Sequence, residues 1–143
     1  MRISSVYTVA VDSGKPDEKP RRDTVLVIDD NVDFCQLISM LGQFYGVRVL
    51  EATDCRKGLD LLIREHARIK LIFLDYFMPG MRPVACARAI TARAGPSVSV
   101  VLVTAGIDPG VRAAELHLSR WIGKPVEPAI LKEIMTENYS GSL

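Results

Sequence analysis

The sequence predicts an α/β protein: a single doubly wound (βα)5 domain with a five-stranded parallel sheet in order 2-1-3-4-5 and helices on both faces. Five short apolar or β-branched runs alternate with five stretches of helical pattern, and such alternation implies parallel pairing through right-handed crossovers. The runs are continuously apolar, as expected of strands that are buried on both faces. The length of 143 residues fits one domain, for which this strand order is the natural choice.

The first strand and helix are expected between residue 24 and the glycine at position 46. Residues 24–28, TVLVI, form a short β-branched run. Asn31 or Asp33 is suited to cap the following helix, because these side chains accept hydrogen bonds from backbone N–H groups of a first turn. The helix is expected to run to about Tyr45, and Gly46 ends it, since glycine readily adopts the left-handed conformation.

The second and third units follow the same pattern. A strand is expected at residues 47–52, and Asp54 is suited to cap the helix after it. A third strand is expected at residues 71–74, LIFL. The loop after it leads into a helix that Pro83 opens, because proline is well tolerated in the first turn of a helix.

The last elements are shorter. A fourth strand is expected at residues 98–103, VSVVLV, and a short helical piece at about residues 109–116. Residues 121–122 indicate a short fifth strand, and Pro128 opens the final helix.

The two ends of the chain differ from this rhythm. Residues 1–22 are expected to form a flexible leader or linker, because the piece SGKPDEKPRRD is polar, charged and interrupted by proline. The preceding ISSVYTVAV has β character and is compatible with an additional strand or with disorder. The folded domain is expected at residues 23–139, with a tail at residues 140–143.

Composition excludes several classes of function. With 18 basic and 17 acidic residues the net charge is +1, which gives no electrostatic argument for binding nucleic acid. No apolar run approaches the roughly 18 residues that a membrane helix needs. We therefore expect a cytoplasmic protein that binds neither DNA nor membranes.

The cysteines Cys35, Cys55 and Cys86 are odd in number and far apart, and they form no C-x-x-C motif. A disulfide framework or a zinc site is therefore not expected. We expect all three to be small apolar side chains within the helices of a reduced protein.

Polar residues follow the predicted strands at the points where these end. Asp29 and Asp30 follow the first strand, Asp75 the third, Thr104 the fourth and Lys124 the fifth. The carboxyl ends of parallel strands share one edge of an open α/β sheet, and ligands bind there. Three carboxylates, a hydroxyl and an ammonium group are therefore expected to converge.

The motifs VLVIDD, LIFLDYFMPGM, VLVTAG and IGKP, in this order and spacing, resemble the response-regulator receiver family over about residues 23–139. The resemblance implies a switch that takes a phosphoryl group from a phosphohistidine and then changes its contacts with a downstream protein target. Neither His66 nor His117 has a partner at triad or metal spacing. The donor is therefore expected on a sensor histidine kinase or a histidine phosphotransfer protein.

The resemblance also implies roles for individual residues. Asp75 is the implied site of phosphorylation, with Lys124 and Thr104 assisting the transfer. Mg²⁺ is the implied cofactor, an ion that prefers oxygen ligands. Its implied ligands are Asp30, Asp75, the backbone carbonyl of Phe77 and, through water, Asp29. Thr104 and Trp121 are the implied switch residues, although Trp121 is larger than the usual Tyr or Phe and could instead only pack at the edge of the sheet.

Two other functions stay open on the sequence. Each site residue has an ordinary alternative, such as a helix cap for Asp29 and Asp30 or a turn residue for Asp75. A pseudo-receiver that only mediates contacts is one alternative, although all five polar residues are present. An aspartyl-phosphate phosphohydrolase is the other, although the acidic pair is adjacent rather than D-x-D and supplies no evident general acid.

The chain departs from the family pattern around the implied site. Arg82 and Pro83 stand where Asp-Gly is usual, and LHLSRW replaces the usual Gly-Ala pair before the fifth strand. The resemblance implies that the side chains at the positions of Phe77 and Gly106 flank the path of an attacking water. Neither offers a polar side chain, so a slow loss of the phosphoryl group is expected.

Overall fold

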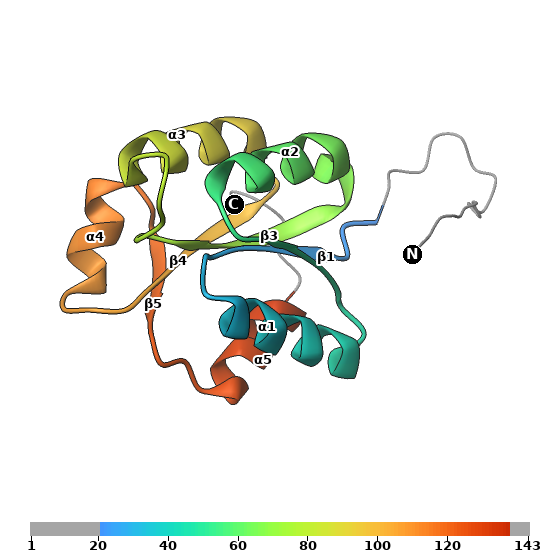
Figure 1. Cartoon of the computed structure of the whole chain (residues 1–143). Helices are drawn as coiled ribbons and strands as arrows, with labels where there is room; N and C mark the ends of the chain where they lie inside the picture. Colours follow the sequence, from blue (N-terminus) through green and yellow to red (C-terminus); the bar gives the residue numbers. More distant parts are fainter. Residues whose placement is uncertain (1–20, 138–143) are drawn as a thin grey trace.

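The computed structural model describes residues 21–137 and shows the predicted α/β architecture (Figure 1). Five parallel strands lie in the order β2-β1-β3-β4-β5, as predicted. The elements in chain order are β1 (Thr24–Ile28), α1 (Val32–Tyr45), β2 (Arg48–Ala52), α2 (Cys55–Glu65), the 3-10 helix η1 (His66–Arg68), β3 (Ile69–Asp75), α3 (Pro83–Ala94), β4 (Ser99–Thr104), α4 (Pro109–Glu115), β5 (Arg120–Gly123) and α5 (Pro128–Thr136). Within the described residues, no helix is long and apolar enough to cross a membrane.

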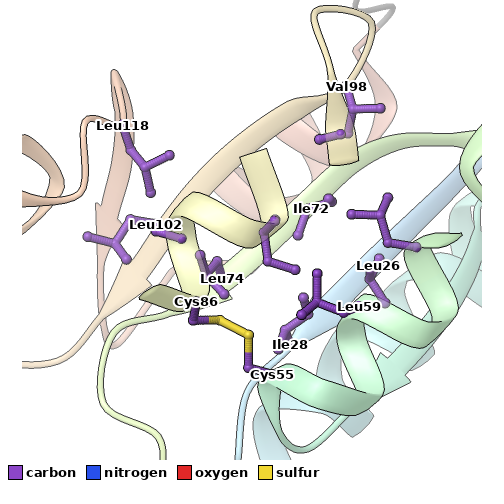
Figure 2. Packing of buried hydrophobic residues seen from close by; sticks show 14 of the residues in the cluster. Leu26, Ile28, Cys55, Leu59, Ile72, Leu74, Cys86, Val98, Leu102 and Leu118 are labelled. Carbon is purple, nitrogen blue, oxygen red and sulfur yellow. A yellow bond between two sulfur atoms is a disulfide. The ribbon is translucent and has the colours of Figure 1, made fainter. Parts of the chain in front are cut away.

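The sheet separates two apolar cores. Figure 1 shows α2 and α3 on one face of the sheet and α1 and α5 on the other. Successive side chains of a strand point to opposite faces, so Leu26 and Ile28 of β1 enter the core beneath α2 and α3, which Figure 2 shows from close by. Val25 and Val27 enter the core beneath α1 and α5. All four are fully buried, which explains why the run is continuously apolar.

Local capping follows the predicted chemistry at three helix ends. Asn31, rather than Asp33, caps α1, and its side chain accepts a hydrogen bond from the backbone N–H of Phe34. Gly46 ends α1 in the left-handed conformation with φ of 73°. Asp54 caps α2 by accepting a hydrogen bond of 2.8 Å from the N–H of Lys57. The Asn31 cap starts α1 immediately after the acidic pair that follows β1.

Strand β3 is longer than predicted and reaches Asp75, and η1 was not predicted. Arg22, which the sequence assigned to the leader, donates hydrogen bonds to the carbonyl oxygens of His66 and Ile69 at 2.7 and 2.8 Å. Residues 1–20 of the predicted leader, the last two residues of the predicted domain (138–139) and the tail at residues 140–143 lie outside the described residues.

The prediction of three reduced cysteines is wrong. Cys55 and Cys86 form a disulfide bond between α2 and α3, with 6.1 Å between their Cα atoms (Figure 2). The two helices are neighbours on the same face of the sheet, and both side chains are 3% exposed. This pairing was hidden because 31 residues separate the two cysteines. Cys35 is a free, buried thiol.

Candidate functional site at the carboxyl edge of the sheet

Three carboxylates lie together where β1 and β3 end. One oxygen of each of Asp29, Asp30 and Asp75 lies within 4.8 Å of the others. The parallel register explains this proximity, because Ile28 at the end of β1 is paired with Leu74, which directly precedes Asp75. Such a group of oxygen donors fits a hard divalent cation, which would offset the mutual repulsion of the carboxylates.

The two members of the acidic pair are in different surroundings. The Asp29 side chain is 1% exposed, and its Oδ1 accepts a hydrogen bond of 2.9 Å from the backbone N–H of Asn31. Its Oδ2 accepts a hydrogen bond of 2.6 Å from Nζ of Lys124. Asp30 is exposed to solvent. Both oxygens of Asp29 are therefore engaged with the protein, whereas Asp30 is accessible to solvent.

Lys124 brings a positive charge to the carboxylates from the end of β5. Its Nζ lies 2.6 Å from Oδ2 of Asp29 and 3.9 Å from Oδ1 of Asp75. Its backbone N–H donates a hydrogen bond of 2.9 Å to the carbonyl oxygen of Thr104, which ties the end of β5 to the end of β4. The ammonium also lies 4.7 Å from the centre of the Phe34 ring. These contacts fix the lysine at the edge of the acidic group.

The surroundings of Asp75 raise the pKa of its carboxyl group. Burial, followed by the negative charges of Asp29 and Asp30, raises the pKa of Asp75 to about 7, while Lys124 and a hydrogen bond from the backbone of Tyr76 act in the opposite direction. Its side chain is largely shielded from water. A cation bound beside Asp75 would favour its ionised form, which is the nucleophilic form of a carboxylate.

Thr104 ends β4 at the same edge. It is 1% exposed and lies one residue beyond Val103, which is paired with Asp75. Its hydroxyl donates a hydrogen bond of 3.1 Å to the carbonyl oxygen of Ala105. The hydroxyl proton is therefore directed to the backbone rather than to a carboxylate.

Phe77 and Trp121 are both partly exposed. The Phe77 side chain is 52% exposed, in the loop between β3 and α3. Trp121 in β5 is 47% exposed and lies against α4, where a Cβ added to Gly110 would come within 3.2 Å of the indole ring. In this structure Trp121 packs at the edge of the sheet.

A polar contact between the loop after β3 and α4 was not anticipated. The Tyr76 hydroxyl donates a hydrogen bond of 2.8 Å to Oε1 of Glu115 and accepts one of 3.3 Å from Arg112. These partners lie 39 and 36 residues from Tyr76 in the sequence. No local spacing signals such a contact, because it depends on how the fold places α4.

Comparison with known proteins identifies the family and agrees with the fold. Residues 25–136 match the family described as the response regulator receiver domain, and the chain belongs to that family. It is therefore the kind of domain that acts as a signalling switch in two-component systems.

The chain spans about a fifth of the length of two curated relatives that it matches, but most of the length of similar solved structures. The putative two-component response regulators ARR21 and ARR13 of Arabidopsis thaliana are 29% and 27% identical to it, over 110 and 113 residues. Each alignment covers 77% of this chain but only 18% and 20% of the relative. A response regulator receiver domain protein from Clostridium thermocellum shares 25% identity with a TM-score of 0.68, covering 78% of this chain and 90% of that one. Chemotaxis protein CheY4 of Vibrio cholerae has 24% identity and a TM-score of 0.67, with 78% and 94% covered.

Proposed function

We propose that Asp75 accepts a phosphoryl group from a phosphohistidine and that the domain then changes its contacts with a downstream protein. The observation that supports this most strongly is the arrangement of Asp29, Asp30 and Lys124 around the buried Asp75. In the transfer, a carboxylate oxygen of Asp75 forms the new P–O bond while the P–N bond to the donor imidazole breaks. The donor histidine belongs to a sensor histidine kinase or a histidine phosphotransfer protein.

We propose Mg²⁺ as the cofactor. Asp30 and Asp75 would hold it directly, Asp29 through water, and the backbone carbonyl of Phe77 would be the remaining ligand from the protein. The engagement of both Asp29 oxygens with Asn31 and Lys124 supports an indirect role for Asp29. When bound, the ion neutralises charge on the transferring group.

The remaining roles are assigned to side chains at the ends of β4 and β5. Lys124 stabilises negative charge on the phosphoryl oxygens, since its Nζ is already within 3.9 Å of Asp75. Thr104 turns its hydroxyl from the Ala105 carbonyl to a phosphoryl oxygen. Trp121 is the proposed second switch residue, and movement of its exposed indole ring against α4 would report the change.

The two alternatives have less support. A pseudo-receiver has no need of the raised pKa of Asp75 or of the ion pair between Lys124 and Asp29. A phosphohydrolase needs a general acid beside the nucleophile, and Tyr76 and Phe77 follow Asp75 instead.

A cytoplasmic location is part of the proposal, although disulfides such as that of Cys55 and Cys86 are uncommon in reducing compartments.

Phosphorylation with a small phosphodonor tests the proposal. The full chain is incubated with acetyl phosphate and Mg²⁺, and its intact mass is measured. We expect one phosphoryl group on the wild-type chain and none on Asp75→Asn. Equal labelling of the two proteins would refute Asp75 as the acceptor. The absence of labelling in both, together with the absence of Mg²⁺ binding, would favour the pseudo-receiver.

A further inference from the structure

A cluster of Tyr76, Phe77, Arg112 and Glu115 joins the loop after Asp75 to helix α4. The guanidinium carbon of Arg112 lies 4.8 Å from the centre of the Tyr76 ring and 5.4 Å from that of the Phe77 ring. The two rings meet edge to face, with 4.7 Å between their centres. The Tyr76 hydroxyl bonds to both Arg112 and Glu115, which are themselves 3.8 Å apart. One guanidinium group on α4 therefore holds two successive residues of the loop.

The residues held in this way are those that directly follow the proposed phosphorylation site. The backbone of Tyr76 hydrogen-bonds to the Asp75 carboxylate. Phe77 supplies the carbonyl oxygen that the proposed function assigns to the metal. Beyond them, Pro79 and Gly80 are exposed, whereas Met78 and Met81 pack against the core beneath α2 and α3. The packing of Met78 and the contact of Phe77 with Arg112 of α4 therefore both constrain the peptide that joins these two loop residues.

We propose that Arg112 is a positioning residue for the metal site: by holding the side chains of Tyr76 and Phe77 against α4, it keeps the Phe77 carbonyl oriented toward the cation. This inference rests on the proposed function, because it concerns the cation of that site. It also couples the binding of the cation to the contacts between the loop and α4. A contact that favours the bound state must be favoured by binding in return, since the coupling of two equilibria is reciprocal.

The proposal predicts the opposite of what charge alone predicts. Arg112 is a cation near a group of three carboxylates, so removing its charge should by electrostatics strengthen the binding of a divalent cation. Removing a positioning contact should weaken it, because the carbonyl must then be ordered at the moment of binding. An ordinary surface ion pair between Arg112 and Glu115 would contribute little in either direction.

The test is a titration of the unphosphorylated full chain with Mg²⁺ in a calorimeter. We expect Arg112→Gln to raise the Kd for Mg²⁺ about threefold to tenfold, which is within what the loss of one hydrogen bond and two cation–π contacts can supply. Tyr76→Phe, which keeps the ring and loses the hydroxyl contacts, should raise it less. Arg112→Lys keeps the charge but not the planar group, and should also weaken binding.

Arg93→Gln is the matched control, because it removes one exposed arginine charge at the far end of α3. It should leave the Kd unchanged or slightly lower, and all variants should melt within a few degrees of the wild type. An unchanged or lowered Kd in Arg112→Gln would overturn the inference and leave the proposed function intact. A wild-type chain that binds no Mg²⁺ at millimolar concentration would overturn both.

Discussion

The ammonium group of Lys124 lies closer to Asp29, at 2.6 Å, than to Asp75, at 3.9 Å, although 95 residues separate Lys124 from Asp29 in the sequence. In the unphosphorylated protein this lysine therefore partly neutralises a carboxylate that borders the proposed metal site. It competes electrostatically with the cation there, yet it is also the charge that a phosphoryl group on Asp75 would meet.

Lys124→Gln should separate these two effects. Removing one positive charge next to the carboxylates should lower the Kd for Mg²⁺ about threefold to tenfold, since charges a few ångströms apart near a surface interact by a few kcal/mol at most. Uptake of a phosphoryl group from acetyl phosphate should become slower in the same variant. Lys124→Arg, which keeps the charge, should not strengthen Mg²⁺ binding. Weaker Mg²⁺ binding in Lys124→Gln would contradict this account of the ion pair.

The raised pKa of Asp75 predicts a pH-dependent cost in stability. The folded protein holds a proton on Asp75 up to a pH of about 7, whereas the unfolded chain releases it near pH 3.8. Between these values the folded state binds more protons, so the free energy of unfolding should fall as pH rises, by about 1.4 kcal/mol for each unit between the two pKa values. Asp75→Asn lacks this group and should become more stable than the wild type at pH 8.

Urea unfolding of both proteins at pH 4 to 8, with a chelator present, measures the difference. Mg²⁺ should remove much of the penalty in the wild type at neutral pH, because a bound cation favours the ionised carboxylate. Parallel pH profiles for the two proteins would contradict the raised pKa.

Much of this fold was predictable from the sequence because its signals are local. The TVLVI run predicts a buried strand by its composition alone, and Asn31 and Gly46 mark the limits of α1 through backbone preferences of single residues. The candidate site residues were also identifiable, since each follows a strand whose carboxyl end lies at one edge of the sheet. The register of β1 with β3 then determines that the acidic pair lies near Asp75.

The features that were not predicted depend on contacts between distant segments. The pairing of Cys55 with Cys86 follows from the packing of α2 on α3, and the spacing of the two cysteines in the sequence does not indicate it. The same holds for Arg112 and Tyr76, which meet only because α4 lies beside the loop after β3.

The disulfide bond should be detectable by counting thiols. Without reductant, the denatured chain should show one reactive thiol, from Cys35, and with reductant it should show all three cysteines. The native protein should react slowly, because burial raises the pKa of Cys35 to about 11. The double substitution Cys55→Ala and Cys86→Ala should lower the free energy of unfolding by about 3–4 kcal/mol, the cost expected for opening a loop of this length. Three thiols in the denatured, unreduced chain would show that the bond is absent.

We propose that Phe77 and Gly106 flank the side from which water approaches a phosphorylated Asp75, but only one of them is a suitable position for a test. Gly106 has a φ of 108°, which strains any residue with a side chain, so Gly106→Glu would disturb the backbone as well as the water path. Phe77 is 52% exposed and lies in the loop, so its side chain can be changed with less effect on the core.

Phe77→Asn should shorten the lifetime of the phosphorylated protein. An apolar ring cannot hydrogen-bond a water molecule, whereas an amide in its place can orient one for attack on phosphorus. The rate of loss should rise by about tenfold or less, because orienting a water contributes less than the roughly 10²–10⁴-fold of a positioned acid or base. Phe77→Leu, which keeps the site apolar, should remain as slow as the wild type. The chains are phosphorylated, the donor is removed, and intact mass is followed over time at saturating Mg²⁺, so that any change in the Phe77 carbonyl does not limit the reaction. A wild type that loses its phosphoryl group faster than Phe77→Asn would show that the ring does not protect it.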